Sequence, residues 1–218
     1  MVGVVVIGVG AVVALGYTTR VAIDVYRAGL TLTGLSPDPS PVTLTIAVPR
    51  NMLRDGATIG SDKPVQQAEL VLHWPGLDGY SPSLAADFKD GSPSAPLVYA
   101  TVAERTVTVD SGTRLDSIYA RYFVGDPVAA PAGLTARALS ADSGYGGEVV
   151  YYGPAGGQRF VARCVARATA DTPATCIRDL PAGHNLTLLY RFNRDIIGDW
   201  QAFDTGMRAL AAQLAAPQ

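Results

Sequence analysis

Residues 186–214 read LTLLYRFNRDIIGDWQAFDTGMRALAAQL, and the spacing of apolar side chains changes within this stretch. Over 186–192 apolar residues occupy every second position, which is the pattern of a half-buried β-strand. Over 196–214 they recur at spacings of four and three residues, which predicts an amphipathic helix. Asn193 or Asp195 can cap this helix. We expect the helix to pack on a sheet, because an apolar helical stripe usually faces a core; a partner-binding stripe is the alternative.

The rest of the chain carries further alternating segments, separated by turns rich in Gly, Pro and Ser. Strands are predicted over 42–48, 68–74, 97–109, 133–139, 147–152 and 158–168. Helical spacing over 115–122 predicts a second helix, with Thr113 and Asp116 as an approximate capping box. The predicted domain is α+β, with a mostly antiparallel sheet and a C-terminal amphipathic helix.

Residues 1–17, MVGVVVIGVGAVVALGY, contain no charged side chain. As a helix they would extend about 25 Å, the short end of what a bilayer core requires. We therefore expect an N-terminal transmembrane helix. The alternatives are a signal peptide cleaved near 14–16, a dinucleotide-binding loop at 6–10 and a buried strand. A signal peptide would begin with a basic region, which is missing. The loop motif would need a third glycine, which is also missing. A strand of seventeen residues would be unusually long.

The predicted organisation has three parts. Residues 1–17 are the anchor, and 18–41 are a juxtamembrane segment and linker. Within that segment we expect a fraying helical extension over 18–35, followed by the stiff Pro-rich stretch SPDPSP at 36–41. Residues 42–218 then form a single β-rich domain, which is long enough to bury a core.

The only cysteines are Cys164 and Cys176, and neither histidine lies at metal-ligand spacing from them. A disulfide that closes about a dozen residues would contribute ~3 kcal/mol. Because disulfides persist in oxidising compartments, the pair favours the periplasm. Arg20 and Arg27, which follow the span, favour a cytoplasmic domain by the positive-inside rule alone. We predict a disulfide and a single-pass inner-membrane protein with its domain in the periplasm; two unpaired buried thiols are the alternative.

The charge of the chain gives no sign of a nucleic-acid partner. The net charge is −2, and charged residues make up 17% of the sequence, below the ~25% typical of soluble proteins. No complete metal-binding or cofactor motif is present. We therefore expect no nucleic acid, no metal and no cofactor.

Three segments carry a family resemblance: VPRNMLR at 48–54, LHWPGLDGYS at 72–81 and FVARC at 160–164. They are similar to segments of an uncharacterised family of small membrane-anchored proteins of GC-rich Gram-negative bacteria. The resemblance covers roughly residues 42 to 205. It implies an anchored topology and no known activity.

The segment VDSGT at 109–113 resembles the aspartate loop of retropepsin-like proteases. In such homodimeric enzymes two aspartates share a proton and activate water, which would make Asp110 the catalytic residue. IIG at 196–198 and SGYGG at 143–147 are candidates for the supporting element and the flap. However, 196–198 belongs to the predicted C-terminal helix. The alternative is a strand-to-helix turn in which Asp110 serves backbone geometry.

Arg159, Arg163 and Arg167 are spaced by four residues, which places them on one side of either a helix or a strand. On a strand the intervening side chains would face the core. Such a row suits an anionic envelope ligand such as phospholipid headgroups. The alternative is a solvated face with scattered acidic partners.

These observations favour a membrane-anchored periplasmic binding or scaffolding protein of the cell envelope, without catalytic activity. Its expected partners are the membrane, through residues 1–17, and an anionic ligand or a protein. The alternatives are an aspartic protease that uses Asp110 and an accessory subunit of an inner-membrane complex.

Overall fold

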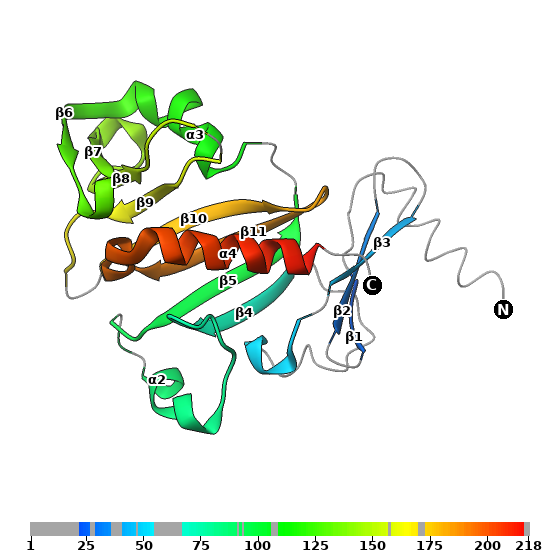
Figure 1. The fold of residues 1–218 in the computed structure, drawn as a ribbon. Helices are drawn as coiled ribbons and strands as arrows, with labels where there is room; N and C mark the ends of the chain where they lie inside the picture. Colours follow the sequence, from blue (N-terminus) through cyan, green and yellow to red (C-terminus); the bar gives the residue numbers. More distant parts are fainter. Residues whose placement is uncertain are drawn as a thin grey trace.

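The computed structural model describes residues 22–26, 29–35, 41–46, 48–54, 67–90, 92, 94–105, 109–156, 158–169 and 173–215. These residues form an eight-stranded sheet, a separate three-stranded sheet and several helices (Figure 1). The longest helix is α4 (Trp200–Leu214), which lies along the eight-stranded sheet.

The eight-stranded sheet is antiparallel throughout, with the strand order β4-β5-β11-β10-β9-β8-β7-β6. Its strands are β4 (Gln67–His73), β5 (Leu97–Glu104), β6 (Phe123–Ala129), β7 (Thr135–Leu139), β8 (Glu148–Tyr152), β9 (Val161–Val165), β10 (Thr175–Ala182) and β11 (Leu186–Asn193). Strand β11 lies between β5 and β10, so the end of the chain joins the first strand pair to the β6–β10 meander.

The N-terminal strands show that the predicted fold class is wrong in its first part. Strands β1 (Ala22–Tyr26), β2 (Gly29–Leu35) and β3 (Pro41–Ile46) form the second sheet, in that order. Strands β1 and β2 lie where we expected a helical extension, whereas β3 corresponds to the strand predicted over 42–48. Alternating Leu and β-branched Thr in β2, GLTLTGL, explains the strand, because β-branched residues favour extended backbone. No helix in the described part of the chain is long and apolar enough to cross a membrane. The predicted transmembrane helix at 1–17 is unsupported and lies outside the described residues.

The shorter helices lie in the connections between strands. The α-helices are α2 (Ala85–Lys89) and α3 (Ser111–Ser117), and the 3-10 helices are η1 (Arg50–Met52), η3 (Pro82–Leu84), η4 (Tyr119–Tyr122), η5 (Pro131–Gly133), η6 (Ala141–Ser143) and η7 (Arg194–Asp199). The stretch 76–96, which its Gly, Pro and Ser content predicts as loop, holds η3 and α2. The apolar stripe predicted as one helix is divided, because 194–199 form η7 before α4 begins.

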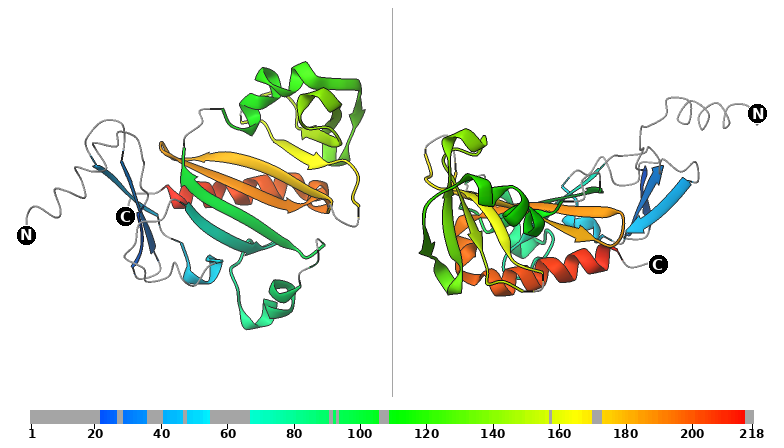
Figure 2. Two further views of the ribbon diagram at one scale, coloured as in Figure 1. Left: turned by 180° about the vertical axis from the view of Figure 1, so that it is seen from behind. Right: turned by 90° about the horizontal axis from the view of Figure 1, so that it is seen from above.

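Helix α4 covers one face of the sheet. Its buried side chains Phe203, Met207 and Leu214 pack on the strand residues that point the same way, such as Leu70 and Leu188. The view from above in Figure 2 shows the sheet and α4 as two layers. We call this side of the sheet the covered face.

Among the described residues, helices cover the opposite face at its two ends. At one end, α3 and η4 contribute Leu115 and Tyr119 to a small core with Val161 of β9. At the other end, Phe88 of α2 packs on Val71 and Leu97. Between these ends, no described helix crosses β5, β11 and β10 (Figure 2, left). We call this uncovered middle part the open face.

The predicted disulfide joins Cys164 and Cys176 across β9 and β10. The two cysteines are direct partners in the register, with their Cα atoms 3.9 Å apart, and both are buried on the covered face. The register pairs β9 with β10 at two positions, whereas it pairs β10 with β11 at eight. The disulfide therefore reinforces the pairing of β9 with β10, which is the shortest in the eight-stranded sheet.

Candidate functional site

The open face is built by the alternation of side chains along β5, β11 and β10. In β11, Leu188 and Tyr190 point to the covered face, so Leu189 and Arg191 point to the open face. The register sets Arg191 between Ile177 of β10 and Tyr99 of β5. Arg191 is thus the middle residue of a row that crosses the strands.

Two large apolar side chains are exposed on this face, although outward positions of a sheet are commonly polar. Tyr99 is 40% exposed and Leu189 is 39% exposed. Leu189 lies opposite Thr101 in the register, in the row next to the one that contains Tyr99. Aromatic and aliphatic surface is therefore gathered at the centre of the open face.

The open face is hollowed in two adjoining places. The larger hollow, of about 460 Å³, extends across β4, β5, β11 and β10 and is lined by Tyr99 and Leu189. The smaller, of about 270 Å³, is lined by Arg163 and Glu148 on β9 and β8. Both hollows share Pro173, Thr175, Ile177 and Arg191 in their lining. Together they form one groove that runs across the strands.

The charges along this groove are unevenly partnered. At the β9 end Arg163 forms an ion pair with Glu148. At the β4 end Arg54 stacks on the Tyr99 ring, 5.6 Å from its centroid, and Glu69 accepts a hydrogen bond of 3.1 Å from Thr101 Oγ1. In the middle, the exposed Arg191 has no ion pair with any described carboxylate. Within the described residues, a cation without an ion pair thus lies beside exposed apolar surface.

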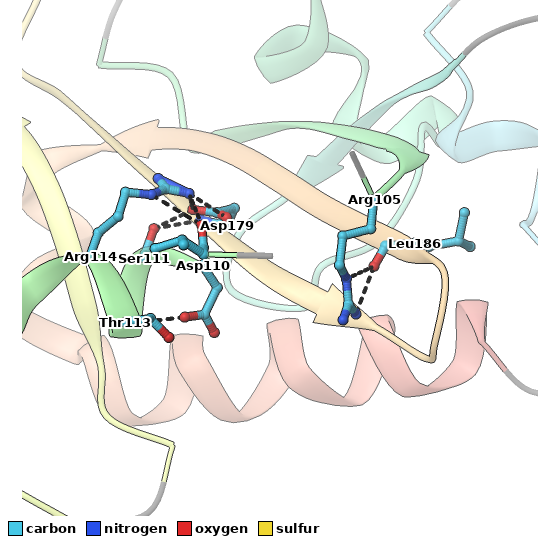
Figure 3. A network of polar contacts seen from close by, with 8 residues as sticks. Arg105, Asp110, Ser111, Thr113, Arg114, Asp179 and Leu186 are labelled. Atoms are coloured by element: carbon cyan, nitrogen blue, oxygen red, sulfur yellow. Dashed lines mark hydrogen bonds and ion pairs between the residues drawn. The ribbon is translucent and has the colours of Figure 1, made fainter. Parts of the chain in front are cut away.

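A polar network fixes α3 against the corner of the open face (Figure 3). Asp179 of β10 accepts hydrogen bonds of 2.8 and 2.7 Å from Arg114 Nη2, one at each carboxylate oxygen. Ser111 Oγ donates to the same carboxylate and accepts from the Asp179 backbone N–H at 3.0 Å. Asp179 is therefore already paired with Arg114 and forms no ion pair with Arg191.

Asp110, the candidate protease residue, caps α3. Its Oδ1 accepts a 2.8 Å hydrogen bond from the Thr113 backbone N–H (Figure 3), which is the usual contact of an N-cap aspartate. The residues after it are helical, and 196–198 lie in η7 and not in a supporting strand. A catalytic role of Asp110 remains untested, and its observed contact is that of a helix cap. Among the described residues, no group of three or more His, Cys, Asp or Glu side chains is placed to hold a metal.

The three arginines of the row predicted as an anion site have different surroundings. Arg159 donates to the Gly153 carbonyl at 2.7 Å and lines a cavity of about 780 Å³ beside α3 and α4. Arg163 lines the groove on the open face and is paired with Glu148. Arg167 is exposed in the bend after β9. Binding of an anionic ligand by this row remains a prediction.

Tyr99, Leu189 and Arg191 were not among the site residues predicted from the sequence. All three lie in stretches whose alternation predicted strands, where the inward positions identified the core. The outward positions held the relevant signal. In 97–104 and 186–193 they include Tyr, Leu and Arg, and a solvated sheet face rarely combines these residues.

Comparison with known structures gives one similar fold. The chain is similar to an immunity protein of the Stenotrophomonas maltophilia type IV secretion system, with a TM-score of 0.51 and 16% sequence identity. The match covers 85% of this chain and 99% of that protein. No protein-family model and no curated protein sequence matches the chain. At this identity the likeness shows a common fold.

Proposed function

We propose that this protein is a non-catalytic binding protein of the immunity type, which protects its cell by binding a protein toxin in the cell envelope. The observation that carries the proposal is the open face, where an exposed tyrosine, leucine and arginine adjoin on a rigid sheet. The fold shared with a secretion-system immunity protein supports the class of function.

The composition of the open face suits a protein partner. Residues that dominate binding energy in protein interfaces are enriched in Tyr, Trp and Arg and cluster near the centre of the contact. Tyr99 and Arg191 are neighbours in the register, and Leu189 lies in the adjoining row. The sheet holds their backbones in place, so little ordering would oppose binding.

The compartment in the proposal rests on the disulfide. Cys164 and Cys176 are buried, directly paired and bonded, and a structural disulfide of this kind persists in an oxidising compartment. We place the domain in the periplasm for this reason. A toxin delivered to the envelope by a neighbouring cell would meet the protein there.

The test is a competition between strains. The gene is deleted from its native strain, and the deletion strain is co-cultured with its parent as the attacker. We expect survival of the deletion strain to fall, and a plasmid copy of the gene to restore it. A parent that lacks its type IV secretion machinery serves as the control attacker and should not kill. Equal survival of the deletion strain and the parent would refute the proposal.

A further inference from the structure

Each face of the sheet presents an arginine among apolar side chains. On the covered face this arginine has an ion-pair partner within the chain. Arg178 of β10 is 2% exposed and stacks on the Phe160 ring, 4.4 Å from its centroid. Asp204 of α4 forms an ion pair with it at 2.8 Å. The segment that covers this face therefore combines an apolar stripe with one carboxylate.

The open face also combines an arginine with apolar side chains, but no described helix covers it. Arg191 lies between Tyr99 and Ile177, next to Leu189, and no described carboxylate pairs with it. The other described acidic residues of the face already have partners or lie away from Arg191. Asp179 is paired with Arg114, Glu148 is paired with Arg163, and Glu69 lies at the β4 end together with Arg54.

We propose that the open face receives a segment of the toxin that presents an aspartate or glutamate to Arg191 and an apolar side chain to Tyr99 and Leu189. The proposal rests on the proposed function and adds the chemistry of the partner. Charge complementarity supports this occupant, because docking a basic segment would bury Arg191 against a like charge, which is costly. A neutral segment would leave the desolvated guanidinium without a counter-charge.

The groove has a suitable shape for an extended segment. Its two hollows, of about 460 and 270 Å³, adjoin at Arg191 and run from β4 to β8. A segment lying across the strands would contact Tyr99 on one side of Arg191 and Ile177 on the other. The carboxylate of the partner would then be surrounded by apolar contacts, which strengthen a charge-assisted hydrogen bond by excluding water.

The test uses the deletion strain with its parent as the attacker, complemented with single variants. We expect Arg191→Glu and Arg191→Gln to lower survival at least about tenfold, because one partner of a desolvated charge pair is lost, with Glu the worse of the two. Arg191→Lys should retain part of the protection. The matched control is Arg121→Glu, a reversal at an exposed arginine on η4, outside the groove, which should protect like the wild type.

A second pair of variants tests the sign of the partner's charge independently of Arg191. Thr187 is half-buried on the open face, two residues before Leu189 on β11. We expect Thr187→Glu to reduce survival and Thr187→Lys to preserve it, since both add a side chain of similar length and differ in charge. Thermal unfolding of each purified variant confirms that the fold is intact.

The outcomes separate the two proposals. Protection by the wild-type gene, with loss in Arg191→Glu and opposite effects of the two Thr187 variants, supports the acidic segment. Full protection by every Arg191 variant, or equal effects of the two Thr187 variants, overturns the acidic segment and leaves the immunity function standing. A deletion strain as resistant as its parent overturns both.

Discussion

The covered and open faces of the same sheet are built from similar residues but differ in what satisfies them. On the covered face, Arg178 has an aspartate partner and Leu188 is fully buried under α4. On the open face, Arg191 lacks an ion pair with any described carboxylate, and Leu189 remains 39% exposed. Leu188 and Leu189 are consecutive, so chain position alone does not assign their roles. The outward residues are therefore suited to a surface that the described part of the chain does not supply.

The largest expected effect is on the covered face, at Asp204. Asp204→Ala would leave Arg178 buried without its partner, so we expect the free energy of unfolding to fall by about 3–5 kcal/mol. Urea denaturation followed by circular dichroism measures the change. Asp142→Ala, at an exposed position on η6, is the control and should have little effect.

A double variant sharpens this prediction. Arg178→Met with Asp204→Leu removes both charges, and we expect it to recover most of the lost stability, because apolar replacement of a buried ion pair is often neutral or favourable. If Asp204→Ala alone costs less than about 1 kcal/mol, the ion pair is not what holds α4 on the sheet.

The next effect concerns the disulfide on the covered face. Replacing Cys164 and Cys176 with alanine should lower the free energy of unfolding by about 3 kcal/mol, because the bond closes a loop with a sequence separation of 12. Dithiothreitol should cause a similar loss in the wild type and none in the double variant. Indifference of the wild type to full reduction would contradict the prediction.

A smaller effect is expected at the helix that bounds the open face. Asp110→Ala removes the cap of α3 and should cost about 1 kcal/mol, whereas Asp110→Asn should cost almost nothing, because asparagine caps equally well. Chemical denaturation of the two variants tests the difference. Peptide cleavage by the wild type that Asp110→Asn abolishes would instead identify a catalytic aspartate.

The smallest expected effect on stability is at Leu189. Leu189→Ala should change the free energy of unfolding by no more than about 0.5 kcal/mol, since the side chain is exposed and contributes little to the core. The matched variant Leu188→Ala, one residue away, should cost about 2–5 kcal/mol. In the competition assay we expect Leu189→Ala to lose protection although its fold stays intact. Equal stability losses at the two positions would remove the distinction between the faces.

The parts of the fold that follow from the sequence are those with an unbroken period. The alternation over 186–192 corresponds to β11, and the helical spacing over 200–214 corresponds to α4, the helix that packs on the covered face. Strand β10 was missed because TCIRDLPA places Arg178 at an inward position, where a charge interrupts the apolar pattern. Its burial depends on Asp204, which lies 26 positions further along the chain, and no local pattern reports such a partner.

The candidate site was less accessible to sequence analysis for the same kind of reason. The open face exists because β5 is a neighbour of β11 in the sheet, although it is distant in sequence from the β10–β11 hairpin, so that Tyr99 and Ile177 flank Arg191. Periodicity identifies which residues share a face within one strand, but the register between strands is a tertiary property. The cysteine pair could be predicted because only one pairing of two cysteines exists.

The short pairing of β9 with β10 has a consequence for how the molecule opens. The pairing spans two register positions, one of which is the disulfide pair itself, and the groove on the open face crosses this pairing, which we call the seam. In the reduced protein, amide hydrogen exchange should quicken first at the seam, while β11, held by β5 and β10 along its length, keeps its protection. Formation of this one disulfide would thus influence how firmly the two parts of the groove are held together.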